Sequence, residues 1–262
     1  MTAKSASAWE VAPRAALARR VVAVAGSRDG RAAPRPVRVV PDGLANLFVS
    51  TPVGAPNELI EFAAYGLKTH ALTVLSPARV ANVSVQIRAA HVGALFGVDA
   101  TELTDRSVPL LELWGPAADR IACDLMRAPS FGARKSVLER ALLERSAALE
   151  DSDARLAEAA SNAIEDRRGR IRVAELARRL GCGERRLLRV FRHHVGVAPK
   201  TFAGIVRFRA AWTELSRGEL QAGVALRRGY SDQAHLLRDF RRYSGTRPRA
   251  VGFLQSAADS GQ

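Results

Sequence analysis

The residues of this chain best suited to chemistry are arginines that recur at a fixed spacing in its last third. The pattern Leu-x-Arg-x-Phe-Arg occurs over residues 187–192 and again over residues 236–241. A guanidinium group is planar and permanently charged, and it donates paired hydrogen bonds to phosphates and to the guanine edge. Arginines spaced in this way share one face of a helix. The pattern therefore indicates two helices that contact an anionic partner such as nucleic acid.

Both arginine patterns lie within an internal repeat. The first copy is Ala177-x3-Gly181 followed by Leu187-x-Arg189-x-Phe191-Arg192-x3-Gly196-x2-Pro199. The second copy is Ala225-x3-Gly229 followed by Leu236-x-Arg238-x-Phe240-Arg241-x3-Gly245-x2-Pro248. The first two matched positions are offset by 48 residues and the other six by 49, so the second copy has one more residue in its turn. Eight matches in register indicate a duplicated structural unit.

Each copy has the spacing of a helix-turn-helix. Apolar residues such as Leu176 and Phe191 fall on the inner faces of two short helices, and Gly181 supplies the left-handed backbone of the turn. The second helix of each copy faces outward with basic residues, and a helix of this width fits the major groove of DNA. Residues 199–217 predict one long helix that holds the two units apart. A separation of about 34 Å would let both units meet successive major-groove turns on one face of the duplex.

The formal charge is concentrated in the same part of the chain. Residues 165–255 hold 21 Lys and Arg against 8 Asp and Glu, whereas residues 1–164 hold 19 against 17. A basic half behind a near-neutral half is typical of a nucleic-acid module joined to a partner with a different task. A solvated basic surface would give the same count of charges. The charge therefore supports nucleic-acid binding only together with the repeat.

The first 115 residues predict strands. Val83, Val85 and Ile87 alternate with polar residues, which is the period of a half-buried strand. Prolines and glycines recur between short apolar runs, so we expect a small barrel or sandwich. The turn Pro41-Asp42-Gly43 predicts a hairpin between residues 37–40 and 44–49. Residues 1–36 predict little order beyond a strand at residues 21–25.

Helical periodicity begins at Pro116 and predicts helices over residues 117–127, 136–150 and 153–164. We therefore expect an α+β chain. Its expected parts are a β-rich barrel- or sandwich-like domain with a helical end for regulation, effector binding or oligomerisation (1–150), a helical linker (151–168), an all-α double helix-turn-helix domain that binds DNA (169–255) and a disordered tail (256–262). No apolar run approaches the roughly 20 residues of a membrane helix, no secretory signal is apparent and two cysteines cannot make a disulfide framework, so we expect a cytoplasmic location.

Two segments carry a family resemblance, namely Val173-Ala-Glu-Leu-Ala-Arg-Arg-Leu-Gly181 through Pro199 and Gly229-Tyr-Ser-Asp-Gln-Ala-His-Leu-Leu-Arg-Asp-Phe240 through Pro248. They resemble the AraC/XylS family of bacterial transcription regulators. The resemblance implies a DNA-binding domain of seven helices, in which the third and sixth enter adjacent major grooves. It implies base-facing positions at Arg185, Leu188 and Arg189 in the first unit and at Gln233, Ala234, His235 and Arg238 in the second. It implies contacts with the DNA backbone by Arg192, Arg241 and Arg242.

The sequence departs from the family pattern at three places. Gly183 stands where a Ser usually precedes the first recognition helix, and the lost cap should cost a few tenths of a kcal/mol. Leu188 often corresponds to a polar base reader, so the first unit would read DNA by two arginines and by apolar contact with thymine methyl groups. Leu236-Leu237 replaces a pair that more often contains Phe, and we expect binding to tolerate this change.

The N-terminal half carries a second resemblance. Val39-Val-Pro-Asp-Gly43, Val85-Gln-Ile-Arg88 and Ala94-Leu-Phe-Gly97 are among the segments that resemble a β-rich, cupin-like domain often found in front of this DNA-binding module. The resemblance implies a regulatory role and names no ligand. The expected partner is a double-stranded DNA operator; RNA polymerase, a small-molecule effector and a second copy of the chain are further candidates.

Two other functions stay open from the sequence. An architectural protein would coat DNA through phosphate contacts alone, whereas base readout adds roughly 4–10 kcal/mol of specificity. An enzyme with a metal-binding cupin-like domain would draw on His70 and His91 with Asp42 or Glu61, but the two histidines are 21 residues apart and lack an H-x-H or H-x3-H pattern. A fused DNA-repair alkyltransferase fails because Cys123 alone cannot supply both a zinc site and a nucleophile. We therefore expect no catalytic residue, no metal and no cofactor.

Overall fold

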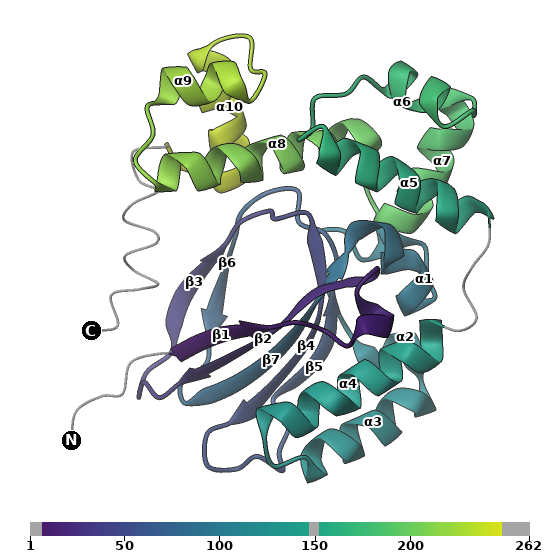
Figure 1. Ribbon diagram of the computed structural model, residues 1–262. Helices are drawn as coiled ribbons and strands as arrows, with labels where there is room; N and C mark the ends of the chain where they lie inside the picture. Colours follow the sequence, from purple (N-terminus) through teal and green to yellow (C-terminus); the bar gives the residue numbers. More distant parts are fainter. Residues whose placement is uncertain (1–6, 147–151, 248–262) are drawn as a thin grey trace.

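The computed structural model describes residues 7–146 and 152–247, which form an α+β protein (Figure 1). The strands are β1 (Ser7–Val11), β2 (Val21–Asp29), β3 (Arg35–Val39), β4 (Leu44–Pro52), β5 (Glu61–Tyr65), β6 (Leu72–Ser76), β7 (Val80–Arg88) and β8 (Ser107–Pro109). Short 3-10 helices are η1 (Ala15–Leu17), η2 (Ala89–His91) and η3 (Ala100–Glu102). The α-helices are α1 (Val92–Phe96), α2 (Leu110–Trp114), α3 (Pro116–Arg127), α4 (Phe131–Ser146), α5 (Ser152–Asp166), α6 (Val173–Arg179), α7 (Glu184–Val195), α8 (Pro199–Ser216), α9 (Gln221–Arg227) and α10 (Gln233–Ser244).

The N-terminal half contains two antiparallel sheets. Six strands form the larger sheet in the order β1-β2-β7-β4-β5-β8, and β3 pairs with β6 in a separate ribbon. In Figure 1 the ribbon stands across from the larger sheet, which gives a sandwich-like arrangement. The β-rich N-terminal half and the following helices were both predicted, and both are confirmed.

The larger sheet buries the face that its sequence pattern predicts. Val83, Val85 and Ile87 of β7 are buried, and the residues between them are only half-buried. The buried face packs against α4, which contributes Leu138 and Leu142 to the same core. The strand period of two therefore places the helices on one face of the sheet and leaves the more polar face toward the ribbon.

Two predictions for the beginning of the chain are wrong. The turn around Gly43 does not close a hairpin, because β3 pairs with β6 while β4 pairs with β5 and β7. The turn instead passes the chain from the ribbon to the larger sheet. Residues 7–36 are also more regular than predicted: β1 is exposed along its whole length at the sheet edge, so its residues show no apolar alternation, and β2 extends to Asp29. Residues 1–6 lie outside the described residues.

The helices predicted after Pro116 are present. The predictions for residues 117–127 and 153–164 correspond to α3 and α5, while α4 begins at Phe131, before its predicted start. Residues 147–151, which include the end of that predicted helix and the first residue of the predicted linker, lie outside the described residues, as does the predicted tail at 256–262. Among the described helices, none is long and apolar enough to cross a membrane.

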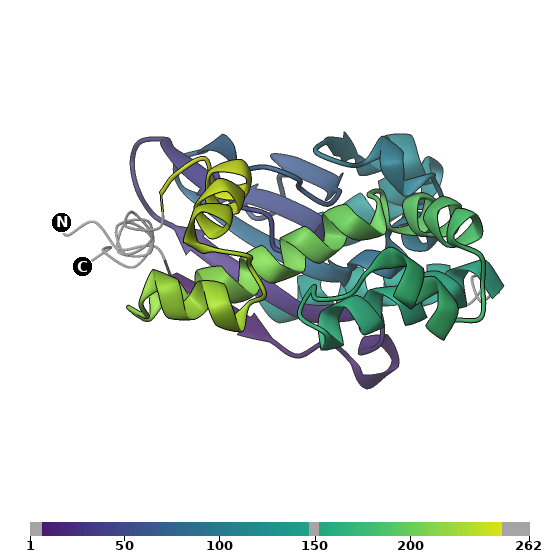
Figure 2. The same cartoon turned by 90° about the horizontal axis from the view of Figure 1, so that it is seen from above.

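The C-terminal helices contain two separate cores. Buried residues of α6 and α7, with Phe202 of α8, belong to the same hydrophobic cluster as the core of the N-terminal half. Further along α8, Ile205, Phe208 and Ala211 belong to a distinct cluster that includes buried residues of α9 and α10. Helix α5, from the predicted linker, packs against α7 and α8. Figures 1 and 2 show α7 and α10 at opposite ends of α8.

Candidate nucleic-acid interface

The repeat forms two helix-turn-helix units, α6–α7 and α9–α10. Residues 180–183 separate the helices of the first unit and residues 228–232 those of the second, so the turn of the second copy is one residue longer, as predicted. Gly181 and Gly229 have φ values of +63° and +73°, a left-handed backbone that a side chain rarely adopts. These glycines make the tight turns that set each second helix across its first.

The repeated apolar residues hold each unit together from inside. Leu187 and Phe191 of α7 are fully buried, and so are Leu236 and Phe240 of α10. The ring of Phe191 lies 5.7 Å from that of Phe202, and the ring of Phe240 lies 5.1 Å from that of Phe208, with both partners on α8. The long helix therefore anchors both units, which leaves their outer faces free for contact with a partner.

The outer face of α7 presents the residues predicted for the first unit. Arg185, Leu188, Arg189 and Arg192 are all exposed. The side chain of Leu188 is 37% exposed, which is unusual for leucine in a helix that buries its other face. Four residues spaced in this way form one continuous strip along the helix, so the sequence-based grouping describes a single surface.

The outer face of α10 presents five of the six residues predicted for the second unit. Gln233, Ala234, Arg238, Arg241 and Arg242 are exposed. His235 is half-buried, and its Nδ1 accepts a hydrogen bond from the backbone N–H of Ser231 at 3.4 Å. The imidazole also stands edge-on to Tyr230 at 5.1 Å between ring centres. His235 thus fixes the turn before α10, in addition to any role toward a base.

The two recognition helices begin differently. Gly183 at the start of α7 has an extended backbone and no side chain to cap the helix. Asp232 holds the equivalent position before α10, and its carboxylate accepts the His235 backbone N–H at 2.6 Å. That bond holds the pKa of Asp232 below its usual range. The predicted loss of a cap in the first unit is therefore confirmed, whereas the second unit keeps its cap.

Ion pairs that the sequence did not reveal fix the second unit on α8. Arg207 of α8 donates to Asp239 of α10 at 3.0 Å, and its guanidinium lies over the Tyr230 ring. Near the end of α8, the buried Glu214 pairs with Arg227 and Arg228 of α9. Asp239 and Glu214 are acidic residues in an otherwise basic segment, and that contrast could have indicated these ion pairs from the sequence.

One acidic residue reaches the first recognition helix from α5. The carboxylate of Asp153 accepts hydrogen bonds from Arg186 at 2.9 Å and from Arg189 at 3.3 Å. The bond from Arg186 holds the pKa of Asp153 below its usual range. By contrast, within residues 7–146 and 152–247, no carboxylate forms an ion pair with Arg238, Arg241 or Arg242 of α10. A residue predicted to face a base in the first unit is thus already paired, and its counterpart in the second unit is not.

The first unit also contacts the N-terminal half directly. Thr104 after η3 donates to the carbonyl of Gly196 at 2.9 Å, and Asp99 pairs with His193 at 3.1 Å. A side chain at Gly93 of α1 would come within 2.8 Å of the His193 carbonyl. These contacts involve the end of α7, so they leave the exposed strip of that helix uncovered.

The polar residues considered for catalysis or metal binding do not come together. His70 lies 3.4 Å from Asp105, whereas His91 lies 3.7 Å from Glu158 of α5. Asp42 accepts the Leu44 backbone N–H. Glu61 accepts the hydroxyl of Tyr65, whose pKa burial and this carboxylate raise. Across the part of the chain that the structure describes, no three His, Cys, Asp or Glu residues are placed to hold a metal ion.

Comparison with known families agrees with this geometry. A helix-turn-helix domain family of the AraC type matches residues 176–252, and a domain of unknown function, DUF6597, matches residues 9–109. Residues 176–252 are therefore a helix-turn-helix domain of the AraC type. This match supports a DNA-binding transcription regulator. None of the curated proteins matches this chain in sequence.

Solved structures similar to this chain include crystal structures of ToxT from Vibrio cholerae. One, from strain O395, is 13% identical, covers 84% of this chain and 96% of its own, and has a TM-score of 0.43. A second, at 1.65 Å resolution, is also 13% identical, covers 96% of this chain and 99% of its own, and has a TM-score of 0.41. At this identity and score, the function of the present chain must be argued from its own residues.

Proposed function

We propose that this chain reads a specific DNA operator with α7 and α10 in two adjacent segments of the major groove, under the control of its N-terminal half. The observation that carries the proposal is the duplicated unit with its arginine-bearing strip exposed twice. The helices that carry these strips, α7 and α10, both pack against α8, which fixes the separation of the strips. A protein that presents two such strips at a fixed distance can read two half-sites with one chain.

We propose different roles for the exposed residues. Arg185, Leu188 and Arg189 would face bases from the first unit, and Gln233, Ala234, His235 and Arg238 from the second. Arg192, Arg241 and Arg242 would bind the DNA backbone. Phosphate contacts position a protein on the duplex, and contacts with base edges supply the sequence preference. Their exposure and helical positions support this division of roles.

We also propose a division of the whole chain. Residues 1–150 would form the regulatory, effector-binding or oligomerisation domain, residues 151–168 the connection and residues 169–255 the DNA-binding domain, with action in the cytoplasm. A seven-helix DNA-binding domain would take α5 from this connection as its first helix, because α5 packs against α7 and α8, and it would then begin at Ser152 rather than at residue 169. The residues after Arg247 lie outside the described residues. Contact with RNA polymerase and self-association remain part of this proposal.

Two arginines of α10 test the proposal. We expect Arg238→Ala to lose about 1–3 kcal/mol on the operator recovered by selecting binding sites from genomic DNA, and to relax the base preference at one position. We expect Arg241→Ala to weaken binding to all sequences alike and to lower the slope of affinity against salt by about one. Filter binding over a range of salt concentrations measures both. Equal and sequence-independent losses for the two variants would favour the architectural alternative.

A further inference from the structure

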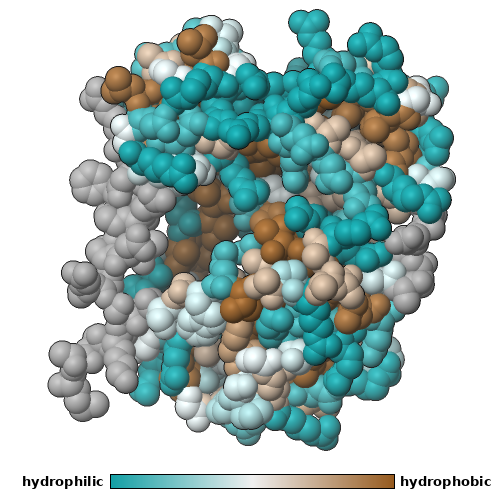
Figure 3. Space-filling model, viewed as in Figure 1, coloured by the Kyte–Doolittle hydropathy of each residue, from teal (hydrophilic) through white to brown (hydrophobic). Residues whose placement is uncertain are grey.

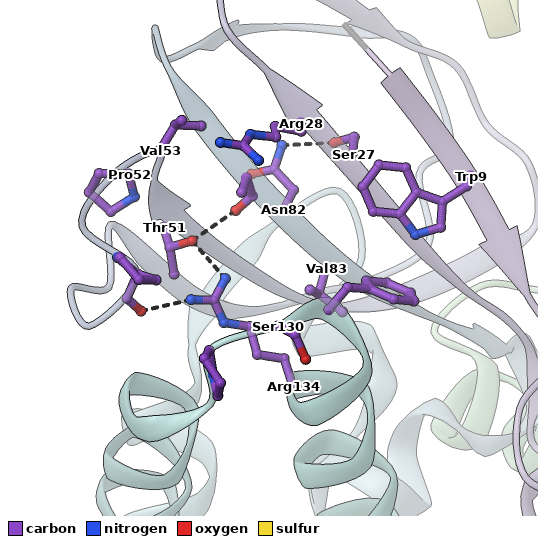
Figure 4. A pocket seen from close by; sticks show the side chains of 15 residues that line it. Trp9, Ser27, Arg28, Thr51, Pro52, Val53, Asn82, Val83, Ser130 and Arg134 are labelled. Carbon is purple, nitrogen blue, oxygen red and sulfur yellow. Dashed lines mark hydrogen bonds between the residues drawn. The ribbon is translucent and has the colours of Figure 1, made fainter.

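A cavity of about 430 Å³ opens in the N-terminal half, where the ends of β2, β4 and β7 meet the turn between α3 and α4 (Figure 4). Its size falls within the range of small-molecule sites in proteins. Trp9 and Phe131 supply aromatic surface, Val53 adds an aliphatic wall, and Arg134 and Asn82 supply polar groups. Its lining residues all lie between Trp9 and Arg134, and the elements that carry them stand apart from the C-terminal helices in Figure 1, so the candidate DNA-binding surface does not use the cavity.

The most unusual residue of this cavity is Arg134 of α4, which is only 5% exposed. Its Nη1 donates to the Thr51 hydroxyl at 2.9 Å, and its Nη2 donates to the Pro56 carbonyl at 2.7 Å. Both acceptors are neutral. Its Nε is buried and has no hydrogen-bond partner. An arginine has five N–H donors, so each Nη group of Arg134 keeps one N–H that no described residue accepts.

No carboxylate in the described part of the chain forms an ion pair with Arg134. Burial lowers the pKa of its guanidinium, and no charge among the described residues opposes that shift. Two half-buried arginines of the C-terminal half differ, because Arg207 pairs with Asp239 and Arg228 pairs with Glu214. A buried cation without an anion is costly, and proteins normally pair it or let a ligand do so. Arg28, at the rim of the cavity, adds a second positive charge.

A second polar group in the cavity lacks a partner. The Nδ2 of Asn82 donates to the Ser27 hydroxyl at 3.1 Å, but its Oδ1 is buried with no donor. Thr51 cannot supply one, because its hydroxyl donates to the Ala81 carbonyl while it accepts from Arg134. The cavity therefore presents unused donors from a cation and an unused acceptor from an amide.

The apolar wall of the cavity depends on a glycine in the neighbouring strand. Trp9 pairs with Gly26 across β1 and β2, and a side chain at Gly26 would come within 2.5 Å of the indole ring. Only glycine lets the indole lie flat on the strand. The indole then meets the Phe131 ring edge-on at 5.5 Å between centres. The two rings form a surface suited to an aromatic or aliphatic group.

We propose that this cavity binds a small organic acid whose carboxylate pairs with Arg134, whose hydroxyl or amine donates to Asn82, and whose apolar group lies against Trp9 and Phe131. Its role as the effector site rests on the proposed function. Helix α4 gives it a route to the DNA-binding domain, because Arg145 near its other end donates to the Leu95 carbonyl of α1 at 2.9 Å. Helix α1 in turn packs against α7.

Calorimetric titration of the full chain with three probes tests the proposal. Phenyllactate carries the carboxylate, the hydroxyl and an aromatic ring; phenyllactamide lacks the charge, and hydrocinnamate lacks the hydroxyl. We expect phenyllactate to bind at least about tenfold more tightly than phenyllactamide, because a charged hydrogen bond to arginine is lost. We expect hydrocinnamate to bind severalfold more weakly than phenyllactate.

Variants assign the binding to this cavity. Arg134→Gln should remove the preference for phenyllactate over phenyllactamide, while Arg140→Gln, on the exposed side of the same helix, should leave it unchanged. Because Arg134→Gln also loses internal hydrogen bonds, a circular dichroism melt checks its fold. Trp9→Ala, at an exposed sheet edge, provides a second variant and should weaken all three probes alike.

Three results would overturn the proposed site. They are equal affinity for the charged and neutral probes, unaltered affinity of the Trp9→Ala variant for the probes, and no saturable binding of either carboxylate probe. These titrations contain no DNA, so they fail or succeed independently of operator binding. A chain that selects an operator but binds none of the probes would refute this site and leave the proposed function intact.

Discussion

The two helix-turn-helix units share a sequence pattern but differ in what surrounds them. The first unit shares the core of the N-terminal half, and Asp153 pairs with two of its arginines, Arg186 and Arg189. The second unit has its own core, against which Val40 of the N-terminal half packs, and among the described residues no carboxylate forms an ion pair with the exposed arginines of α10. The comparison teaches that the two copies share an exposed strip of arginines but differ in how extensively the N-terminal half packs against them. Figure 3 shows hydrophilic side chains spread over the C-terminal helices.

The largest expected effects come from the two buried phenylalanines that occupy matching positions. Phe191→Ala and Phe240→Ala should each lower the free energy of unfolding by about 3–5 kcal/mol, since each leaves a cavity in a closed core. Hydrogen exchange should separate them: the first variant should speed exchange in α1 and η3 as well as in α7, and the second only in α8 to α10. Identical patterns would contradict the existence of two cores.

Acid should destabilise the contact between η2 of the N-terminal half and α5. Burial lowers the pKa of His91 to about 4, close to Glu158 of α5 and to Arg19 and Arg20. The unfolded chain binds this proton at a higher pH than the folded chain, so the free energy of unfolding should fall by about 1–2 kcal/mol between pH 7 and pH 5.

Chemical denaturation at several pH values measures this loss. His91→Gln should flatten it, because glutamine does not titrate. If that variant keeps the full pH dependence, another group is responsible and the assignment to His91 is wrong.

The helix caps should respond in opposite directions. Gly183→Ser should raise the free energy of unfolding by a few tenths of a kcal/mol to about 1 kcal/mol, because a side chain there meets no atom within 4 Å and can cap α7. Asp232→Ala should lower it by about 0.5–2 kcal/mol through loss of the existing cap. Thermal melts check both. A destabilising Gly183→Ser would mean that the turn needs glycine for another reason.

Asp153 should restrain DNA binding slightly. Its pairs with Arg186 and Arg189 lie at the surface, where water and salt screen them, so each is weak. Asp153→Ala should therefore raise DNA affinity by about two- to fivefold at low salt, measured by fluorescence anisotropy. Asp124→Ala removes a comparable acidic residue beside Arg140 and serves as the control. An unchanged affinity for Asp153→Ala would show that this contact does not compete with DNA.

The double unit could be predicted because its contacts are local. Glycine at the turn and apolar residues at helical spacing are visible within about 25 residues of sequence, and the repeat shows them twice. The exposure of the predicted arginines follows directly from the same spacing.

The contacts that join the first unit to α5 and to the N-terminal half could not be predicted in this way. Asp153 and Arg189 are 36 residues apart, and Thr104 and Gly196 are 92 apart, so nothing in the local pattern joins them. The hairpin prediction failed for a related reason: turn residues specify a bend but not the strand that will pair beyond it. Arg134 is similar, because a single arginine in a helix is normally exposed and its burial depends on β4 and the residues after it.

Chemical footprinting of the major groove on the selected operator tests the two-helix account most directly. We predict two protected patches on one face of the duplex, about one helical turn apart; Arg189→Ala should remove protection from one patch and Arg238→Ala from the other. A single patch, two patches on opposite faces, or equal loss at both patches in each variant would contradict reading by α7 and α10 together.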